Sequence, residues 1–169
     1  MGAMAHTPLM RAETNFAFPV DEVIDLAQRH DARAIVMCSP NNPTGTAYAE
    51  ADIRRVIEAT PGLVLLDEAY REFNRQDLCH LVRDYDNVVI FRTFSKALAM
   101  AGVRVGYCIA RPEMAAEIGK VKLPYALNIV SEAVTLAALD RPDLFAPTIE
   151  TARAERARVS AALGAMPGV

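Results

Sequence analysis

Ala34-Ile35-Val36-Met37-Cys38 is a continuous apolar run that passes directly into the turn sequence Ser39-Pro40-Asn41-Asn42-Pro43. A short apolar run bounded by turn residues is typical of a strand that is buried on both faces. The preceding residues, from about 20 to 30, place apolar side chains at the spacing i, i+3, i+4 and i+7, which predicts an amphipathic helix. A helix followed by a buried strand is the repeating unit of α/β proteins.

The same unit recurs further along the chain. A second helix around residues 53–57 is stopped by Pro61-Gly62, and a short helix is expected near residues 76–82. Further strands are expected at residues 63–66, 88–91 and 105–110. The last of these follows Lys96 too closely to run parallel to its neighbour. The pattern therefore predicts a three-layer α/β/α fold with a mostly parallel sheet and one antiparallel strand.

Three helices are expected after the sheet. They span residues 113–121, residues 128–139 and a long stretch from Arg141-Pro142 to Gly164. The long helix keeps one apolar face over about five turns, and Arg156 occupies the only polar position in that stripe.

Composition and charge exclude several classes of protein. The formal net charge is -3, and there is no basic block of the kind that nucleic acid binds. No apolar run reaches the ~18 residues of a membrane span, and no secretory signal is visible, so a cytoplasmic protein is expected. The three cysteines lack C-x-x-C spacing and are expected to be buried, reduced thiols. The three histidines are scattered, so no metal site is expected.

Polar clusters follow the predicted strands, where open α/β sheets bind their ligands. They are Asn41-Asn42-Pro43-Thr44-Gly45, Asp67-Glu68-Ala69-Tyr70 and Thr93-Phe94-Ser95-Lys96, the last continuing through residues 101–107. Taken alone, each has a common structural explanation: a turn, a helix cap or a solvated charge. Their order and their placement after successive strands favour a shared ligand site.

The stretches "SPNNPTGT", "LLDEAYREF" and "RTFSKALAMAGVRVGY" resemble fold-type-I enzymes that depend on pyridoxal 5'-phosphate (PLP). The resemblance is strongest to the aminotransferases that include histidinol-phosphate aminotransferase, and it covers nearly the whole chain after the first dozen residues. It implies that the protein is a cytoplasmic homodimer, that it acts in histidine biosynthesis and that PLP is its cofactor. The implied reaction converts histidinol phosphate and 2-oxoglutarate to imidazole-acetol phosphate and glutamate.

The resemblance also assigns the catalytic roles. Lys96 would form the Schiff base with the cofactor and move the proton between the substrate Cα and the cofactor C4′. Asp67 would face the pyridine nitrogen and keep the ring protonated. Asn42 and Tyr70 would both hydrogen-bond the phenolic oxygen of the cofactor.

The phosphate of the cofactor would be held by Thr93, Ser95 and Arg104, because two hydroxyl donors and one guanidinium match its oxygens. Tyr125 resembles part of a Pro-Tyr element of the histidinol-phosphate subgroup, although a packing role explains it as well. The charged residues that follow Asp67, namely Glu68, Arg71 and Glu72, are expected to face solvent.

The chain departs from these enzymes in length, since they are about twice as long. Residues 1–6 are expected to be a vector scar or a disordered start, residues 7–140 an incomplete PLP-binding large domain, and residues 141–169 a helix leading to an absent small domain. The upstream phosphate loop and the downstream arginine for the substrate carboxylate are missing, so activity of this chain alone is left open.

Two other interpretations remain at this point. One is another enzyme on the same platform, such as an aromatic or aspartate aminotransferase or a threonine-phosphate decarboxylase. The other is a non-catalytic aminotransferase-like module for sensing or dimerisation.

Overall fold

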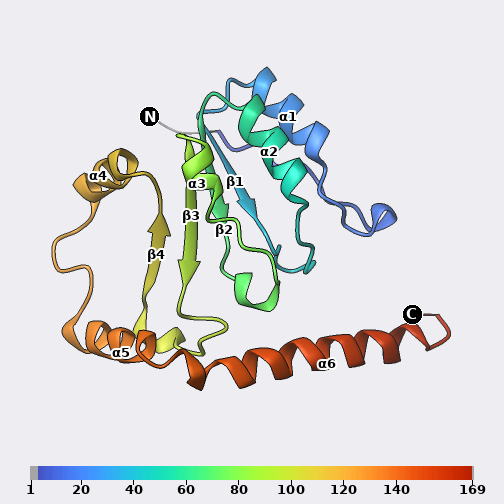
Figure 1. The fold of residues 1–169 in the computed structure, drawn as a ribbon. Coiled ribbons are helices and arrows are strands. Elements are labelled where there is room, and N and C mark those ends of the chain that lie inside the picture. The colour runs from blue at the N-terminus through green and yellow to red at the C-terminus, as the bar shows by residue number, and fades with distance from the viewer. Residues whose placement is uncertain (1–3, 169) are drawn as a thin grey trace.

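The computed structural model describes residues 4–168 (Figure 1). Its sheet contains β1 (Ala34–Cys38), β2 (Leu63–Asp67), β3 (Val88–Thr93) and β4 (Gly106–Ile109). The α-helices are α1 (Val20–Arg29), α2 (Glu50–Ala59), α3 (Leu81–Asp84), α4 (Pro112–Val121), α5 (Ile129–Leu139) and α6 (Ala146–Gly164). Short 3-10 turns lie at η1 (Ala12–Thr14), η2 (Arg71–Phe73), η3 (Ala101–Val103) and η4 (Pro142–Leu144).

The strands are ordered β1-β2-β3-β4, as along the chain. β1, β2 and β3 pair in parallel, and β4 pairs antiparallel with β3. The expected α/β fold class, a mostly parallel sheet with one antiparallel strand, is therefore confirmed. Both parallel crossovers step to the next strand in the same direction, and because crossovers are right-handed, α2 and α3 lie on one face of the sheet.

The hydrophobic core forms between these helices and the covered face of the sheet. Ile53 of α2, Leu81 of α3, and Val64, Leu66 and Ile90 of the strands are all 0% exposed. They join Val23 of α1 in a single buried cluster. Val23 and Ile53 lie on the apolar helix faces predicted from the sequence, and the strand residues lie in its continuous apolar runs.

The opposite face of the sheet is incompletely covered. Val36 in β1 is 67% exposed and Phe91 in β3 is 39% exposed, although both were expected to be buried by a second layer. One-residue alternation puts them on the other side of the strands from the core residues. Among the described residues, the three-layer arrangement is thus incomplete on this side.

Three of the differences between the expected and the observed element boundaries have a local cause. The helix expected near 76–82 is only the turn 81–84, because the Asp77 side chain accepts a hydrogen bond from the Cys79 backbone N–H at 3.0 Å and holds the chain in a turn. β3 continues to Thr93, since Arg92 and Thr93 still pair with β4. The long helix begins at Ala146 instead of Arg141-Pro142, after the 3-10 turn η4.

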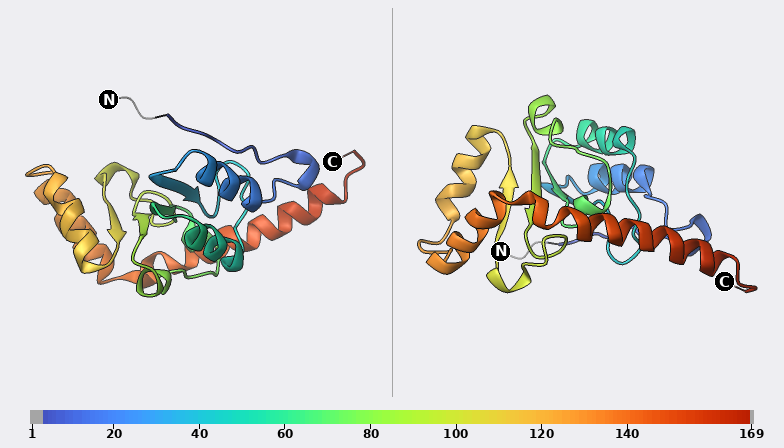
Figure 2. Two further views of the ribbon diagram at one scale, coloured as in Figure 1. Left: turned by 90° about the horizontal axis from the view of Figure 1, so that it is seen from above. Right: turned by 60° about the horizontal axis from the view of Figure 1, so that its bottom comes forward.

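α6 crosses below the sheet, on the side where β1, β2 and β3 end (Figure 1). The two views in Figure 2 show it running the width of the molecule, from the α5 side to the side of η1. Arginines fix it there: Arg153 Nη2 donates to the Glu72 carbonyl at 2.6 Å, and Arg156 Nη1 donates to the Phe73 carbonyl at 3.0 Å. Its expected apolar stripe is not buried, because Val159 and Leu163 are 43% and 44% exposed.

The start of the chain is described from residue 4, so positions 1–3 of the expected scar lie outside the described residues. The ring of His6 stacks on that of His30, with centroids 3.7 Å apart. Among residues 4–168, no helix combines the length and the apolar composition that crossing a membrane requires.

The difference between the two faces of the sheet can be tested with one substitution at two positions. Val64→Ala should lower the free energy of unfolding by about 2 kcal/mol, because it removes two fully buried methyl groups and leaves a cavity. Val36→Ala, on the exposed face, should change it by no more than about 0.5 kcal/mol. Urea unfolding measures both, and equal losses would contradict the one-sided core.

Candidate functional site

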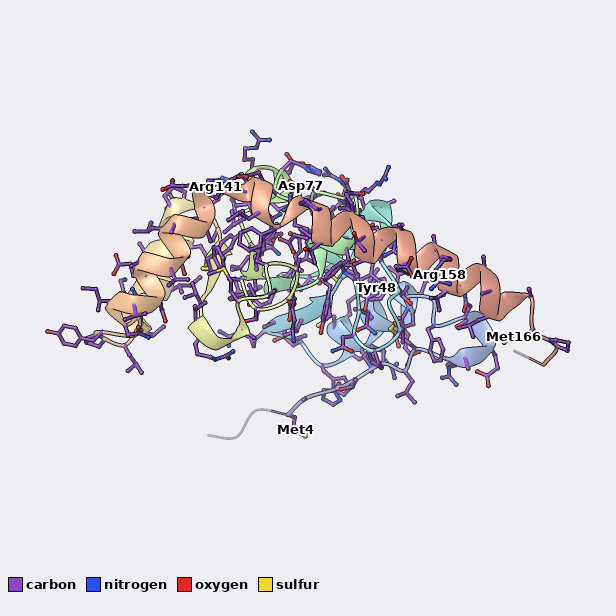
Figure 3. All side chains as sticks on the ribbon, turned by 90° about the horizontal axis from the view of Figure 1, so that it is seen from below. Met4, Tyr48, Asp77, Arg141, Arg158 and Met166 are labelled. Atoms are coloured by element: carbon purple, nitrogen blue, oxygen red, sulfur yellow. The ribbon has the colours of Figure 1, made fainter. Side chains whose placement is uncertain are left out.

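The three polar clusters lie at the carboxyl ends of β1, β2 and β3. In the parallel register Cys38 is the partner of Asp67, and Asp67 is the partner of Phe91, two residues before Thr93. The Ser39 backbone N–H also donates to the Asp67 carbonyl at 3.0 Å. The loops that carry the predicted site residues therefore start from neighbouring points at one edge of the sheet. Figure 3 views the molecule from below, with α6 crossing the picture between Arg141 and Met166.

Asp67 is the last residue of β2, and its carboxylate is held in place from two sides. Oδ1 accepts the Ala69 backbone N–H at 2.9 Å, and Oδ2 lies 3.9 Å from the thiol sulfur of Cys38. Burial and, after it, the charge of Asp67 raise the pKa of the Cys38 thiol. Sequence reasoning missed this contact, although the position of Cys38 at the end of the adjacent strand was visible.

Asn42, Tyr70 and Lys96 come together from three separate loops. The Asn42 side-chain amide donates to the Tyr70 hydroxyl at 3.1 Å. The amine of Lys96 stands over the same tyrosine ring, 5.6 Å from its centroid. These contacts join positions that are 28 and 26 residues apart along the chain, and they follow from the shared sheet edge.

Thr93 and Ser95 form a tight turn at the end of β3. The Thr93 hydroxyl oxygen accepts the Ser95 backbone N–H at 3.1 Å and lies 3.4 Å from the Val105 carbonyl oxygen, to which it donates. The Phe94 N–H donates to the same carbonyl at 3.2 Å. This tethers the backbone next to Arg104 to the Thr93 turn.

The guanidinium of Arg104 points back to its own 3-10 turn, where Nη1 donates to the Ala101 carbonyl at 2.9 Å. Arg104 has a positive φ of 56° at the end of η3. α5 supports this turn from behind, because the buried Ser131 hydroxyl donates to the Val103 carbonyl at 2.6 Å. The Arg104 backbone is therefore held next to the Thr93 turn. Among the described residues, the Arg104 guanidinium donates no hydrogen bond to Thr93 or Ser95.

The expectation that Glu68 faces solvent is wrong. Glu68 is 2% exposed and is paired with Arg92, whose Nε and Nη2 lie 2.8 and 2.7 Å from Glu68 Oε2. Burial raises the pKa of the Glu68 carboxyl, and the neighbouring Arg92 opposes that shift. Arg71 and Glu72 are also partly buried, with 28% and 19% of their side chains exposed.

Two further expectations need correction. The three cysteines are free but only partly buried, because strand alternation turns Cys38 and Cys108 away from the packed core. Tyr125 is 100% exposed, so it does not pack against the described part of the chain. Among the described residues, no group of three or more His, Cys, Asp or Glu side chains is arranged to hold a metal ion.

An open cavity of about 260 Å³ lies beside the Asn42–Tyr70 pair. Asn41 and Pro40 line it on the β1 side, and Phe73, Asn74 and Arg156 line it on the side of η2 and α6. Its lining carries several amide groups and one guanidinium, so it offers hydrogen-bond donors beside the Asn42–Tyr70 pair.

The sequence model of the family described as "Aminotransferase class I and II" matches residues 4–164. The chain belongs to this family. The match contains every predicted site residue and all four strands of the sheet.

Individual relatives within the family carry more than one name. Histidinol-phosphate aminotransferase of Chlorobaculum tepidum is 41% identical over 156 residues, which are 92% of this chain and 45% of that protein. Aromatic amino acid aminotransferase of Mycolicibacterium smegmatis is 45% identical over 139 residues, or 79% of this chain and 38% of that protein. The chain therefore spans less than half the length of the curated relatives it matches.

The fold is also that of a solved relative. The crystal structure of histidinol-phosphate aminotransferase from Sinorhizobium meliloti, in complex with pyridoxal-5'-phosphate, superposes with a TM-score of 0.75 at 28% identity. The superposition covers 83% of this chain and 40% of that one.

The contact between Cys38 and Asp67 can be tested without any ligand. Asp67→Asn removes the negative charge that raises the Cys38 pKa, so the pKa should fall and more thiolate should form at a given pH. Alkylation at Cys38 should then be faster, as measured by peptide mass spectrometry over a range of pH. Cys79, whose pKa is raised by burial and Asp77, is the internal control and should not change. If the pH profile of Cys38 alkylation is the same in Asp67→Asn as in wild type, the Cys38 and Asp67 side chains are not in contact.

Proposed function

We propose that this chain is the cofactor-anchoring part of a PLP-dependent aminotransferase, and that Lys96 is the residue to which the cofactor is attached. The observation that supports this most strongly is the position of the Lys96 amine over Tyr70, with the Tyr70 hydroxyl bonded to Asn42. A side-chain amine, a phenol–amide pair and the carboxylate of Asp67 lie at one sheet edge, as the ring of PLP requires.

The residues present fit the cofactor in their chemistry. Asp67 would accept a hydrogen bond from the ring nitrogen and keep it protonated. Its Oδ2 can accept that bond, because its hydrogen-bond partner among the described residues is the weakly donating Cys38 thiol. Asn42 and Tyr70 would donate to the phenolic oxygen. Thr93 and Ser95 would bind the phosphate, and Arg104 would join them by turning its guanidinium away from Ala101.

The bound cofactor supplies an electron-withdrawing ring that takes up the electron pair left on the substrate carbon. The protein moves the proton: Lys96 Nζ would take it from the substrate Cα and return it at the cofactor C4′. Lys96 is exposed in this chain, so water exclusion from that transfer must come from surfaces that cover the sheet edge.

For the substrate, we propose histidinol phosphate with 2-oxoglutarate as the amino acceptor. Relatives with the name histidinol-phosphate aminotransferase share 34 to 46% identity with this chain. A second candidate is an aromatic amino acid, supported by the 45% identity to the mycobacterial relative of that name. The site residues described above contact the cofactor in either reaction and do not distinguish the two.

The domain organisation and assembly are part of the same proposal. Residues 7–140 would be a portion of the large domain, and residues 141–169 would lead towards a small domain. A homodimer is consistent with the apolar side chains exposed along residues 121–139, including Ile129 at 80% and Val130 at 67%.

Attachment of the cofactor provides the direct test. The sequence contains three lysines, Lys96, Lys120 and Lys122. With PLP added, borohydride reduction followed by peptide mapping should place the label on Lys96 and on neither of the others. Lys96→Met should abolish the label, whereas Lys120→Met, a matched change at an exposed lysine, should retain it. Labelling elsewhere, or none, would contradict the assignment and favour a non-catalytic module.

The substrate can be tested in a single half-reaction, which needs only the loaded protein and one amino donor. The absorbance of the bound cofactor should change faster when histidinol phosphate is added than when phenylalanine is added. Asp67→Asn should slow this conversion on the order of 100-fold, because the ring nitrogen loses its charged partner. Faster conversion with phenylalanine would select the aromatic alternative.

A further inference from the structure

Arg92 and Glu68 form a buried ion pair beneath the candidate site. The Arg92 side chain is 7% exposed and that of Glu68 is 2% exposed. Both Nε and Nη2 of Arg92 reach Glu68 Oε2, at 2.8 and 2.7 Å. Two charges removed from water this completely are uncommon in a domain of this size.

The pair is placed next to two residues of the proposed site. Glu68 directly follows Asp67, and Arg92 directly precedes Thr93. Neighbouring residues of a strand point to opposite faces of the sheet, so the pair lies on the helix-covered face and Asp67 on the other. The backbones beside the pair are joined as well, because the Glu68 N–H donates to the Phe91 carbonyl at 2.8 Å.

The pair is extended towards the turn that replaces the expected helix. Arg92 Nη2 also donates to Asp77 Oδ1 at 3.1 Å, and Arg71 Nη2 donates to Asp77 Oδ2 at 2.7 Å. The Cys79 backbone N–H and then Arg71 hold the pKa of Asp77 below its ordinary value. A single guanidinium thus ties the residue after Asp67 to a second charged group 9 residues further along the chain.

Stability alone is a weak explanation for this arrangement. The cost of removing both charges from water largely offsets their attraction, and apolar side chains of similar volume often give equal or greater stability. What the ion pair adds is direction, because a guanidinium fork fixes the orientation of the carboxylate it binds.

We propose that the Arg92–Glu68 pair is a positioning device that fixes the peptide bond between Asp67 and Glu68, and so holds the Asp67 carboxylate in the orientation it needs. This rests on the proposed function, in which Asp67 faces the ring nitrogen of PLP. Because the Glu68 side chain is anchored on the helix-covered face of the sheet, the Asp67 carboxylate keeps its contacts with the Ala69 N–H and the Cys38 thiol.

The thiol of Cys38 reports the position of Asp67 without any cofactor. The test is the double variant Glu68→Leu/Arg92→Met, which removes both charges and leaves no unpaired one. It should unfold in urea near the wild-type midpoint, and Cys38 should nevertheless be alkylated several-fold faster, in the direction of Asp67→Asn. Arg54→Met, which breaks the ion pairs of this α2 residue to Glu50 of α2 and Asp84 of α3, is the control and should leave Cys38 unchanged.

Two results would overturn the proposal. One is a pH profile of Cys38 alkylation in the double variant that equals that of wild type. The other is a pH profile of Cys38 alkylation that Asp67→Asn leaves unchanged. If the double variant does not fold, Arg92→Lys carries the test, since it keeps the charge but loses the fork that joins Glu68 to Asp77. It should accelerate Cys38 alkylation in the same direction.

The same variants distinguish this inference from the proposed function. In protein loaded with PLP, the double variant should shift the pH profile of the cofactor absorbance relative to wild type and Arg54→Met. If wild-type protein takes no label at Lys96, the proposed function fails, while the thiol result still decides whether the pair positions Asp67.

Discussion

The parallel register of β1, β2 and β3 is the constraint on which the rest of the molecule depends. It places Cys38, Asp67 and Phe91, which are 29 and 24 residues apart along the chain, next to one another near one edge, and thereby gathers the loops that follow the three strands. The side-chain contacts of the site, Asn42 with Tyr70 and Lys96 with Tyr70, are made between these loops. A shift of one residue in either pairing would turn Asp67 or Thr93 to the opposite face.

The elements after the sheet serve mainly to hold the loops at this edge. Ser131 of α5 fixes η3, which directly precedes Arg104, and the arginines of α6 bind the carbonyls of the loop that follows Tyr70. None of these bonds buries a large apolar surface. α5 and α6 are located by directed polar contacts, while many of their apolar residues remain exposed.

The sequence predicted the strands because the apolar runs are continuous, and it placed the candidate site at their distinct polar ends, which the structure brings to one edge of the sheet. It did not predict the buried pair under the site. Glu68 lies in a charged stretch, and its partner Arg92 is 24 residues away. Only the register of β2 and β3 reveals that the two face each other on the covered side. The limits of α3 and α6 were missed for a local reason, since the Asp77 turn and η4 compete with the helical pattern.

The exposed side of the sheet makes the stability of this chain depend on its surroundings. Val36 and Phe91 keep much of their apolar surface in water, so anything that covers them binds the folded state in preference to the unfolded one. The melting temperature of the chain should therefore rise with the concentration of whatever occupies that face, whether it is another copy or another polypeptide. Thermal stability is then a property of the assembly as much as of the 169 residues.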